Sequence, residues 1–310
     1  MKVPFRKRAR RFLRAYAILA LLALLGLLPL GLALRFGRWA GRMAFGLLGG
    51  ERRRSLEHLE IAFPEKSEEE REAIARRMFE SLGESAMELA KLRTIDRILG
   101  TYVRITPSAK EVLERVRNGN GAVMVTGHIG NWELLFRRCI HEGLPAHAVG
   151  KESHDPRFTR LMERVRGKER VIWRGAKGAS RQMLRVFREN GYLALLIDQD
   201  TKVQGVFVPF FGRLAYTPRA AADLAFRFDA GVAAIFIHRL PGGGHEITAR
   251  EIPKPEGRGE AAVVELTAAM TRAIEDEIRR HPHEWVWMHP RWKTRPPAND
   301  RALARVESSA

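Results

Sequence analysis

The chain of 310 residues contains a single cysteine, Cys139. One thiol excludes an intramolecular disulfide framework and any metal site built from several cysteines. Cys139 follows Phe136 within an expected helix, so we interpret it as a small buried side chain rather than a nucleophile. Internal repeats and low-complexity tracts are also absent, and the content of aromatic and other hydrophobic residues is that of a folded protein.

Acidic residues are few relative to basic ones. The chain has 36 aspartates and glutamates against 54 lysines and arginines, which gives a formal net charge of +18. So large an excess requires an anionic partner, and nucleic acid, an anionic membrane and phosphorylated substrates all qualify. The basic residues are dispersed and no nucleic-acid-binding motif is present, so we expect no nucleic acid partner. A non-enzymatic protein that binds anionic lipid remains an alternative supported by the charge alone.

Acids are missing altogether from residues 2–14, which carry seven basic residues, and residues 15–34 are uncharged. Twenty such residues match the thickness of the hydrocarbon core of a bilayer. A cleaved signal peptide is usually shorter and is followed by a small-residue cleavage site, whereas the basic segment 35–38 follows here. The pattern predicts a retained N-terminal membrane helix. Basic flanks on both sides favour the inner, cytoplasmic membrane with the main domain on its cytoplasmic face. Pro29 can bend the segment so that both of its ends stay on one face of the membrane, as in a monotopic anchor. A full span that places the main domain outside the cytoplasm is the alternative.

The sequence divides into four segments by composition. We expect a basic tail and membrane anchor helix over 1–36, a helical lead-in at the membrane interface over 37–100, an α/β domain over 101–296, and a loose polar tail over 297–310. Within the lead-in, Ser67 followed by three glutamates predicts a helix N-cap with an acidic first turn.

In the third segment short apolar runs alternate with helical patterns. Strands are expected at 122–125, 146–149, 170–173, 192–197, 232–237 and 246–249, and helices at 155–166, 179–190, 218–228 and 260–280. This alternation predicts an α/β fold with a mostly parallel central sheet flanked by helices.

The most informative motif is GHIGNWE, residues 127–133, which follows the first of these strands. Asn131 is a plausible helix N-cap, which places Glu133 in the first helical turn and His128 in the preceding loop. From there the imidazole can turn back toward Glu133. A histidine oriented by a carboxylate suits a general base that removes a hydroxyl proton. The spacing alone is not diagnostic, because His147 and Glu152 share it; His147 is expected to be a strand residue.

Two aspartates, Asp198 and Asp200, follow a second strand. Sites of parallel sheets lie at the carboxyl ends of the strands, so these acids should lie near His128. They can orient the histidine, bind a sugar hydroxyl or hold a metal. A metal site would combine His128, His154, Asp198 and Asp200, but no pair of them has tight ligand spacing, so we predict no metal.

Other blocks suggest substrate contacts. The segment 206–212 contains Phe207, Phe210 and Phe211, and suits either the wall of an acyl-chain groove or a buried edge strand that ends at a glycine turn. The basic residues between the two strand ends can clamp a phosphate or stabilise an oxyanion; they are Lys151, Arg164, Arg166 and Arg174.

A final block, residues 283–293, combines alternating Trp285 and Trp287 with a basic end. The alternation predicts a strand with one buried face. We expect the last three residues of the block to lie at the membrane interface or against a phosphorylated headgroup; they are Arg291, Trp292 and Lys293.

The order of these blocks resembles the bacterial lipid A biosynthesis acyltransferase family, the late lauroyl and myristoyl transferases, with phosphatidylinositol mannoside acyltransferases as relatives. The resemblance covers about residues 40–296, and its motifs are GHIGNWE, IDQD, GVFVPFFG with a following threonine, and EWVWMHPRWKTRP. It implies a membrane-bound enzyme of lipopolysaccharide biosynthesis that moves a fatty acyl group from acyl carrier protein or coenzyme A to a glycolipid hydroxyl. No cofactor is implied.

The resemblance also implies roles for single residues. His128 is the base and Glu133 its partner, Arg166 is similar to an arginine at the mouth of the active site, and Asp198 matches the first acid of the Asp-Gln-Asp element. We expect Asn131, Lys151, Asp200 and the three phenylalanines of 206–212 to contact substrate. A membrane-tethered thioesterase or esterase that uses the same histidine on water remains the alternative enzyme.

Overall fold

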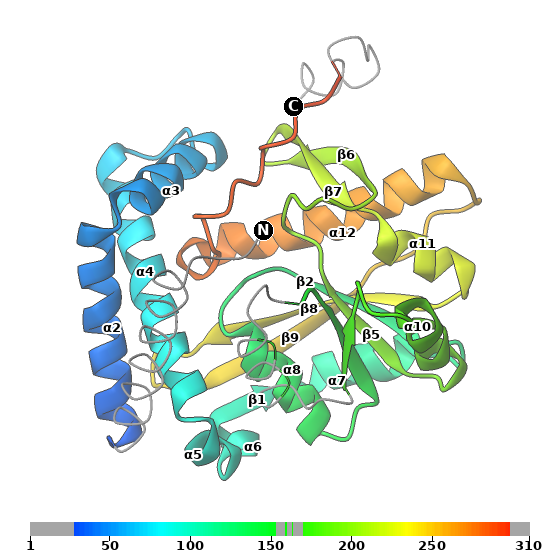
Figure 1. Ribbon diagram of the computed structural model, residues 1–310, viewed down its shortest axis with the longest axis horizontal. Coiled ribbons are helices and arrows are strands. Elements are labelled where there is room, and N and C mark those ends of the chain that lie inside the picture. The colour runs from blue at the N-terminus through cyan, green and yellow to red at the C-terminus, as the bar shows by residue number, and fades with distance from the viewer. Residues whose placement is uncertain (1–27, 153–158, 160–162, 164–169, 298–310) are drawn as a thin grey trace, which may run out of the picture.

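The computed structural model describes residues 28–152, 159, 163 and 170–297 (Figure 1). Its centre is a seven-stranded sheet in the order β1-β9-β8-β2-β5-β3-β4. Only the β8–β9 pair is antiparallel; the other neighbours are parallel. The strands are β1 (Val103–Ile105), β2 (Ala122–Thr126), β3 (Ala146–Gly150), β4 (Val171–Trp173), β5 (Tyr192–Leu196), β8 (Gly231–Arg239) and β9 (His245–Glu251). The predicted α/β class and mostly parallel sheet are confirmed.

Helices cover both faces of the sheet, and β2 shows why. All five of its residues are buried. Val123 and Val125 belong to one apolar core, whereas Ala122 and Met124 belong to a second core on the opposite face. A strand buried on both sides reads as a continuous apolar run, which is how the sequence presents it. The helices of this domain are α7 (Pro107–Val116), α8 (Trp132–His141), α10 (Ala179–Arg188), α11 (Ala220–Arg227) and α12 (Glu260–Arg280).

A helical unit precedes the sheet and packs beside it, as Figure 1 shows for α2 and α4. It consists of α2 (Leu30–Leu47), α3 (Gly49–Ala62), α4 (Glu68–Ala90), α5 (Leu92–Asp96) and α6 (Leu99–Tyr102). The predicted cap of α4 is confirmed: the Ser67 hydroxyl accepts from the Glu70 backbone N–H, and the Glu70 carboxylate accepts from the Ser67 N–H.

Glycines bring α2 and α4 into backbone contact. A Cβ on Gly41 would lie 2.2 Å from the carbonyl oxygen of Phe79, and one on Gly83 would lie 2.0 Å from the carbonyl oxygen of Gly37. Only hydrogen fits at these positions, so the approach of the two helices is set by residues without side chains.

The N-terminal membrane helix remains a prediction, because most of it lies outside the described residues. The end of the uncharged run forms the start of α2, which begins after Pro29 and continues past the expected boundary at residue 36. Within the described residues, none of the helices combines the length and the apolar character needed to cross a bilayer.

The aromatic end of the domain differs from expectation. Trp285 forms only an isolated β-bridge with Ile129, and residues 285–287 are not a strand. Both Trp285 and Trp287 are buried, and so is Trp292, whose ring packs 5.4 Å from that of His58 and 5.6 Å from that of Phe210. The expectation that Trp292 meets the membrane or a headgroup is therefore wrong: large rings from three segments build a shared core instead.

Candidate active site

The carboxyl ends of β2 and β5 bring His128 and Asp198 together. Thr126 and Leu196 pair in register, and each functional residue comes two positions later. The imidazole Nδ1 of His128 lies 2.8 Å from Oδ1 of Asp198. The strand-end rule therefore places the two groups correctly.

Asp198 is held as an ionised carboxylate. It is 2% exposed, and its Oδ2 accepts hydrogen bonds from the backbone N–H of His128 and from Nε1–H of Trp285, each at 2.7 Å. Burial by itself would raise the pKa of Asp198, but the charge and hydrogen bonds of His128 together with the indole bond lower it to about 2. Because the carboxylate accepts at Nδ1, that nitrogen carries a proton.

The second ring nitrogen of His128 is therefore the one that can accept a proton. The His128 side chain is 22% exposed, and its ring packs edge-on against Trp132 with 4.9 Å between centroids. An imidazole that is fixed at Nδ1 by a buried carboxylate and is partly exposed has an arrangement that suits a general base.

The turn that carries His128 is fastened to the segment after α12. The Gly130 N–H donates to the carbonyl of Glu284 at 3.0 Å, and the Val286 N–H donates to the carbonyl of His128 at 3.2 Å. Gly130 has φ +56°, and a Cβ there would lie 2.2 Å from the Ile237 carbonyl oxygen. The second glycine of the motif is thus required by both conformation and space.

Asn131 caps α8 as predicted. Its Oδ1 accepts from the Leu134 N–H at 3.2 Å, and its Nδ2 donates to Glu88 at 2.8 Å. Both ends of the amide are engaged within the protein, so its predicted contact with substrate has no geometric support here and stays a prediction.

Glu133 lies in the first turn of α8, as predicted, and is buried. Its Oε1 accepts from Nε1–H of Trp132 at 3.1 Å. The hydrogen bond to the histidine ring that the sequence assigned to Glu133 is made by Asp198 instead, because Asp198 arrives from the neighbouring strand at the level of Nδ1. A catalytic role for Glu133 stays a prediction.

Three other residues were predicted to contact substrate: Asp200, Lys151 and Arg166. Asp200 accepts from the N–H and hydroxyl of Thr294 at 2.7 and 3.0 Å, so it fastens the loop after β5 to the C-terminal segment. Lys151 is exposed just beyond β3. Arg166 lies outside the described residues, as does His154.

The phenylalanine block forms a hairpin of β6 (Gly205–Phe210) and β7 (Arg213–Pro218). Phe211 and Gly212 make its two-residue turn with φ +52° and +70°. Phe210 and Phe211 are buried, and their rings pack against Trp285 and Trp287, which supports the buried-strand alternative for both. Phe207 is half-buried beside Tyr216 and keeps its predicted role in a groove.

Sequence reasoning missed a buried arginine behind this hairpin. Arg291 is fully buried; it donates from NH1 to the Tyr216 carbonyl and from NH2 to the Thr217 hydroxyl, both at 2.6 Å. Burial lowers its pKa to about 10, although the charges of Asp198 and Asp200 act in the opposite direction. The expectation that Arg291 lies at the membrane interface or against a phosphorylated headgroup is therefore wrong: it joins β7 to the C-terminal segment.

A buried ion cluster, also missed, supports the other side of the turn. His238 at the end of β8 lies between two carboxylates, with Nδ1 2.7 Å from Glu284 Oε2 and Nε2 2.7 Å from Glu277 Oε1. Burial alone would lower the pKa of His238, but the two carboxylates raise it to about 9. Together with His281, His238 and Glu284 are close enough to hold a metal. Two carboxylates on its two nitrogens favour a protonated His238 instead.

Protonated His238 should make the stability of the fold depend on pH. Its pKa rises from 6.5 to about 9 on folding, so its contribution is complete below pH 6.5 and is lost as the pH rises through about 9. We expect the free energy of unfolding to fall by up to about 3 kcal/mol over this window. Denaturant titrations at pH 6, 7.5 and 9 measure it. His238→Gln should lack this part of the slope; an equal slope in that variant would contradict the assignment.

Comparisons with known proteins identify a family and related sequences. The sequence model of the family described as bacterial lipid A biosynthesis acyltransferase matches residues 3–294. The lipid A biosynthesis myristoyltransferase of Escherichia coli (strain K12) is 26% identical over 277 residues, which cover 88% of this chain and 83% of the relative. The lipid A biosynthesis palmitoleoyltransferase of the same organism is 28% identical over 282 residues, or 87% of each.

Similarity extends to a second group of relatives. The phosphatidylinositol mannoside acyltransferase of Mycolicibacterium smegmatis (strain ATCC 700084 / mc(2)155) is 25% identical over 179 residues, which cover 56% of this chain and 57% of the relative. The two groups share acyltransferase names and differ in the glycolipid that those names specify.

Proposed function

Because the chain belongs to the bacterial lipid A biosynthesis acyltransferase family, an O-acyltransferase group of the glycolipid type, we propose that it moves a fatty acyl group from an acyl thioester to a hydroxyl of a glycolipid such as a lipid A precursor, with His128 as the general base. The donor is acyl carrier protein or coenzyme A. The observation that carries the proposal is the contact of His128 Nδ1 with the buried carboxylate of Asp198.

The chemistry needs no covalent enzyme intermediate. The acceptor oxygen attacks the thioester carbonyl while its proton moves to Nε2 of His128. The tetrahedral intermediate then expels the thiolate, which takes the proton back from the imidazolium. Asp198 remains ionised and stabilises the charged ring, while N–H groups at the start of α8 or a nearby cation stabilise the oxyanion.

The remaining predicted residues have roles around this pair. Glu133 lies beside Trp132, which contacts the His128 ring, and so borders the base. We assign Arg166 and Lys151 to phosphate or thioester recognition, and Phe207 to the acyl chain. These assignments rest on the resemblance of the motifs and on charge.

A product analysis tests the proposal. Purified protein in mixed micelles is given acyl-acyl carrier protein or acyl-coenzyme A, with and without a lipid A precursor, and products are identified by mass spectrometry. We expect an acylated glycolipid that forms only with the acceptor present, and the better donor identifies the carrier. Release of free fatty acid at the same rate with or without acceptor would support the thioesterase alternative and refute the proposal.

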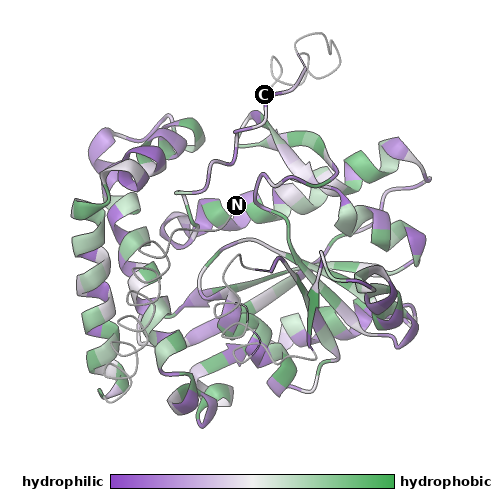
Figure 2. Cartoon of the chain, in the orientation of Figure 1, coloured by the Kyte–Doolittle hydropathy of each residue, from purple (hydrophilic) through white to green (hydrophobic). Residues whose placement is uncertain are grey.

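We also place the protein at the inner membrane through its N-terminal part, with the catalytic domain on the cytoplasmic face. Apart from Ile98, the exposed large apolar side chains of the described residues all lie on α2 or at its C-cap. They are Leu32, Trp39, Met43, Leu47 and Leu48. Apolar bands run along α2 in Figure 2. Helical spacing puts the first four on one face, and arginines of the same helix suit anionic headgroups.

Trp39 should therefore report contact with lipid. In vesicles of anionic phospholipid that contain brominated chains, the full-length protein should show quenched tryptophan fluorescence, and Trp39→Phe should lose most of that quenching. Trp173→Phe, on β4 far along the chain, is the matched control and should retain it. Equal quenching in wild type and Trp39→Phe would contradict the placement of α2 at the membrane.

A further inference from the structure

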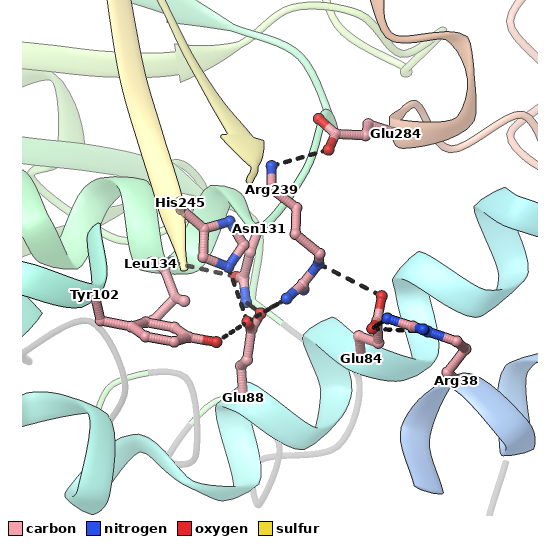
Figure 3. Close-up of polar contacts among 9 residues, drawn as sticks. All are labelled: Arg38, Glu84, Glu88, Tyr102, Asn131, Leu134, Arg239, His245 and Glu284. Carbon is pink, nitrogen blue, oxygen red and sulfur yellow. Dashed lines mark hydrogen bonds and ion pairs between the residues drawn. The ribbon is translucent and has the colours of Figure 1, made fainter. Parts of the chain in front are cut away.

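A single buried carboxylate joins the lead-in helices to the active-site turn. Glu88 of α4 has no exposed surface and accepts hydrogen bonds from four side chains (Figure 3). Its donors are the Tyr102 hydroxyl at 2.7 Å, Nε2 of His245 at 2.8 Å, the Arg239 guanidinium at 2.7 and 2.8 Å, and Nδ2 of Asn131 at 2.8 Å. These donors come from α6, β8, β9 and the residue before α8.

The bond from Asn131 is the one that bears on the site. Glu88 accepts from the amide nitrogen and thereby directs the amide oxygen of Asn131 toward the Leu134 N–H, which it caps. Asn131 ends the turn that begins at Gly127 and contains His128. A carboxylate can only accept, so Glu88 fixes which end of the Asn131 amide faces it. A side-chain amide at position 88 could face either end, because it both accepts and donates.

A second connection runs through Arg239. Its guanidinium makes a fork with the Glu88 carboxylate, and its backbone N–H donates to Oε1 of Glu284 at 2.9 Å. The carbonyl of Glu284 accepts from the Gly130 N–H. Glu88 thus supports the turn from both its helix end and its middle.

Both charges of this fork are retained in the folded protein. Burial raises the pKa of Glu88, but His245 and Arg239 lower it well below its usual range. Burial likewise lowers the pKa of Arg239, but Glu88 and Glu84 raise it above its usual range. The Glu88–Arg239 contact is therefore a charge-assisted ion pair with two hydrogen bonds.

We propose that Glu88 is a positioning residue for acyl transfer: through Asn131 and Arg239 it holds the turn that carries His128 in register with Asp198. This inference rests on the proposed function of His128. The competing interpretation is that Glu88 only stabilises the fold. Removal of one partner of a buried ion pair is destabilising in any protein, because it leaves the other charge unpaired.

Glu80 on the same helix separates the two interpretations. It is buried like Glu88 and pairs with Arg42 at 2.8 Å, but its ion pair leads to α2 rather than to the sheet. Glu88→Gln turns an acceptor oxygen into an NH₂ group that faces the donors Asn131 and Arg239. Glu80→Gln makes the same chemical change away from the site.

Steady-state kinetics and melting temperatures of both variants are the first measurement. We expect Glu88→Gln to lower kcat on the order of 10²-fold, the loss typical of small misplacement, with KM for the acyl donor unchanged. Glu80→Gln should keep kcat within about twofold, with a smaller loss of melting temperature because the Arg42 side chain is 55% exposed. Equal kcat losses in the two variants would overturn the inference.

Asn131→Ser supplies a second route if Glu88→Gln folds poorly. Serine still offers a capping hydroxyl but is too short to reach Glu88. We expect a loss of kcat in this single variant with Glu88 intact. In the double variant with Glu88→Gln the losses should not multiply, since one contact is removed in both. Independent, multiplied losses would contradict positioning through Asn131.

Hydrogen exchange gives a readout that does not require turnover. Backbone amides of residues 131–136 should exchange faster in Glu88→Gln than in wild type and should be unchanged in Glu80→Gln. Unchanged exchange in Glu88→Gln refutes the inference, whatever the activity. If the wild-type protein acylates no glycolipid, the proposed function is refuted. The exchange data then still test whether Glu88 holds the turn through Asn131.

Discussion

Replacement of His128 by alanine should reduce acyl transfer by about 10²- to 10⁴-fold, the range that a positioned general base supplies. The variant lacks Nε2 of His128, which is the atom that takes the proton from the acceptor hydroxyl in the proposed mechanism. It also leaves Asp198 with its bonds from the His128 backbone and Trp285, so the turn keeps its shape. Acylated product per unit time, measured by mass spectrometry, gives the result.

Fold and membrane attachment provide the controls for His128→Ala. Recovery in the membrane fraction should equal that of wild type, and the melting temperature should fall only slightly, because the buried carboxylate of Asp198 keeps two of its three hydrogen bonds. Activity equal to wild type would refute the role of His128 as the base. Loss of attachment together with activity would mean that the variant had damaged the fold rather than the chemistry.

Asp198→Asn should be almost as damaging, with a loss of up to about 10⁴-fold, as in triads where the orienting acid becomes an amide. The carboxylate accepts three hydrogen bonds, and an amide cannot accept all three because its NH₂ group donates. With the amide NH₂ donating to Nδ1, the imidazole would carry its proton on Nε2, and Nε2 could no longer accept the proton of the acceptor hydroxyl. The kcat of the variant measures this loss.

Two matched variants sharpen this second prediction. Asp200→Asn changes the same chemical group two residues away and should cost little activity, since Asp200 bonds only to Thr294 among the described residues. Glu133→Gln tests the acid that the sequence motif favoured. A loss for Glu133→Gln that exceeds the loss for Asp198→Asn would reverse our assignment of the acid that orients the ring.

The sequence predicted the frame of the site because that frame depends on local patterns. Six apolar runs corresponded to six of the strands, and the rule that sites form at strand ends placed His128 near Asp198. The N-cap of α8 was also predictable, because Asn131 precedes an apolar helix with an acid in its first turn.

The choice between Glu133 and Asp198 was not predictable from spacing. Glu133 is five residues from His128 and Asp198 is seventy, and only the register of β2 with β5 brings the distant acid to Nδ1. Spacing along the chain describes what a local turn permits, whereas tertiary pairing decides which permitted contact forms.

Burial of aromatic and charged residues was the other limit. Trp292 and Arg291 have the composition of a membrane-facing end, yet both are buried behind the hairpin. Arg291 can be buried because a backbone carbonyl, a threonine hydroxyl and the Phe210 ring, 4.9 Å from its guanidinium carbon, replace part of its hydration. These acceptors and the ring contact come from residues far away in sequence, so no local sequence pattern predicts that the arginine is buried.

The glycine contact between α2 and α4 limits where a junction can be placed in a chimaeric protein. Because Gly37, Gly41 and Gly83 leave no room between the two backbones, α2 is packed directly against α4 as part of the folded unit. A chimaera that exchanges the chain before Pro29 for a foreign anchor keeps this joint whole. A junction placed inside α2 would sever it and release the Arg38–Glu84 pair that lies alongside.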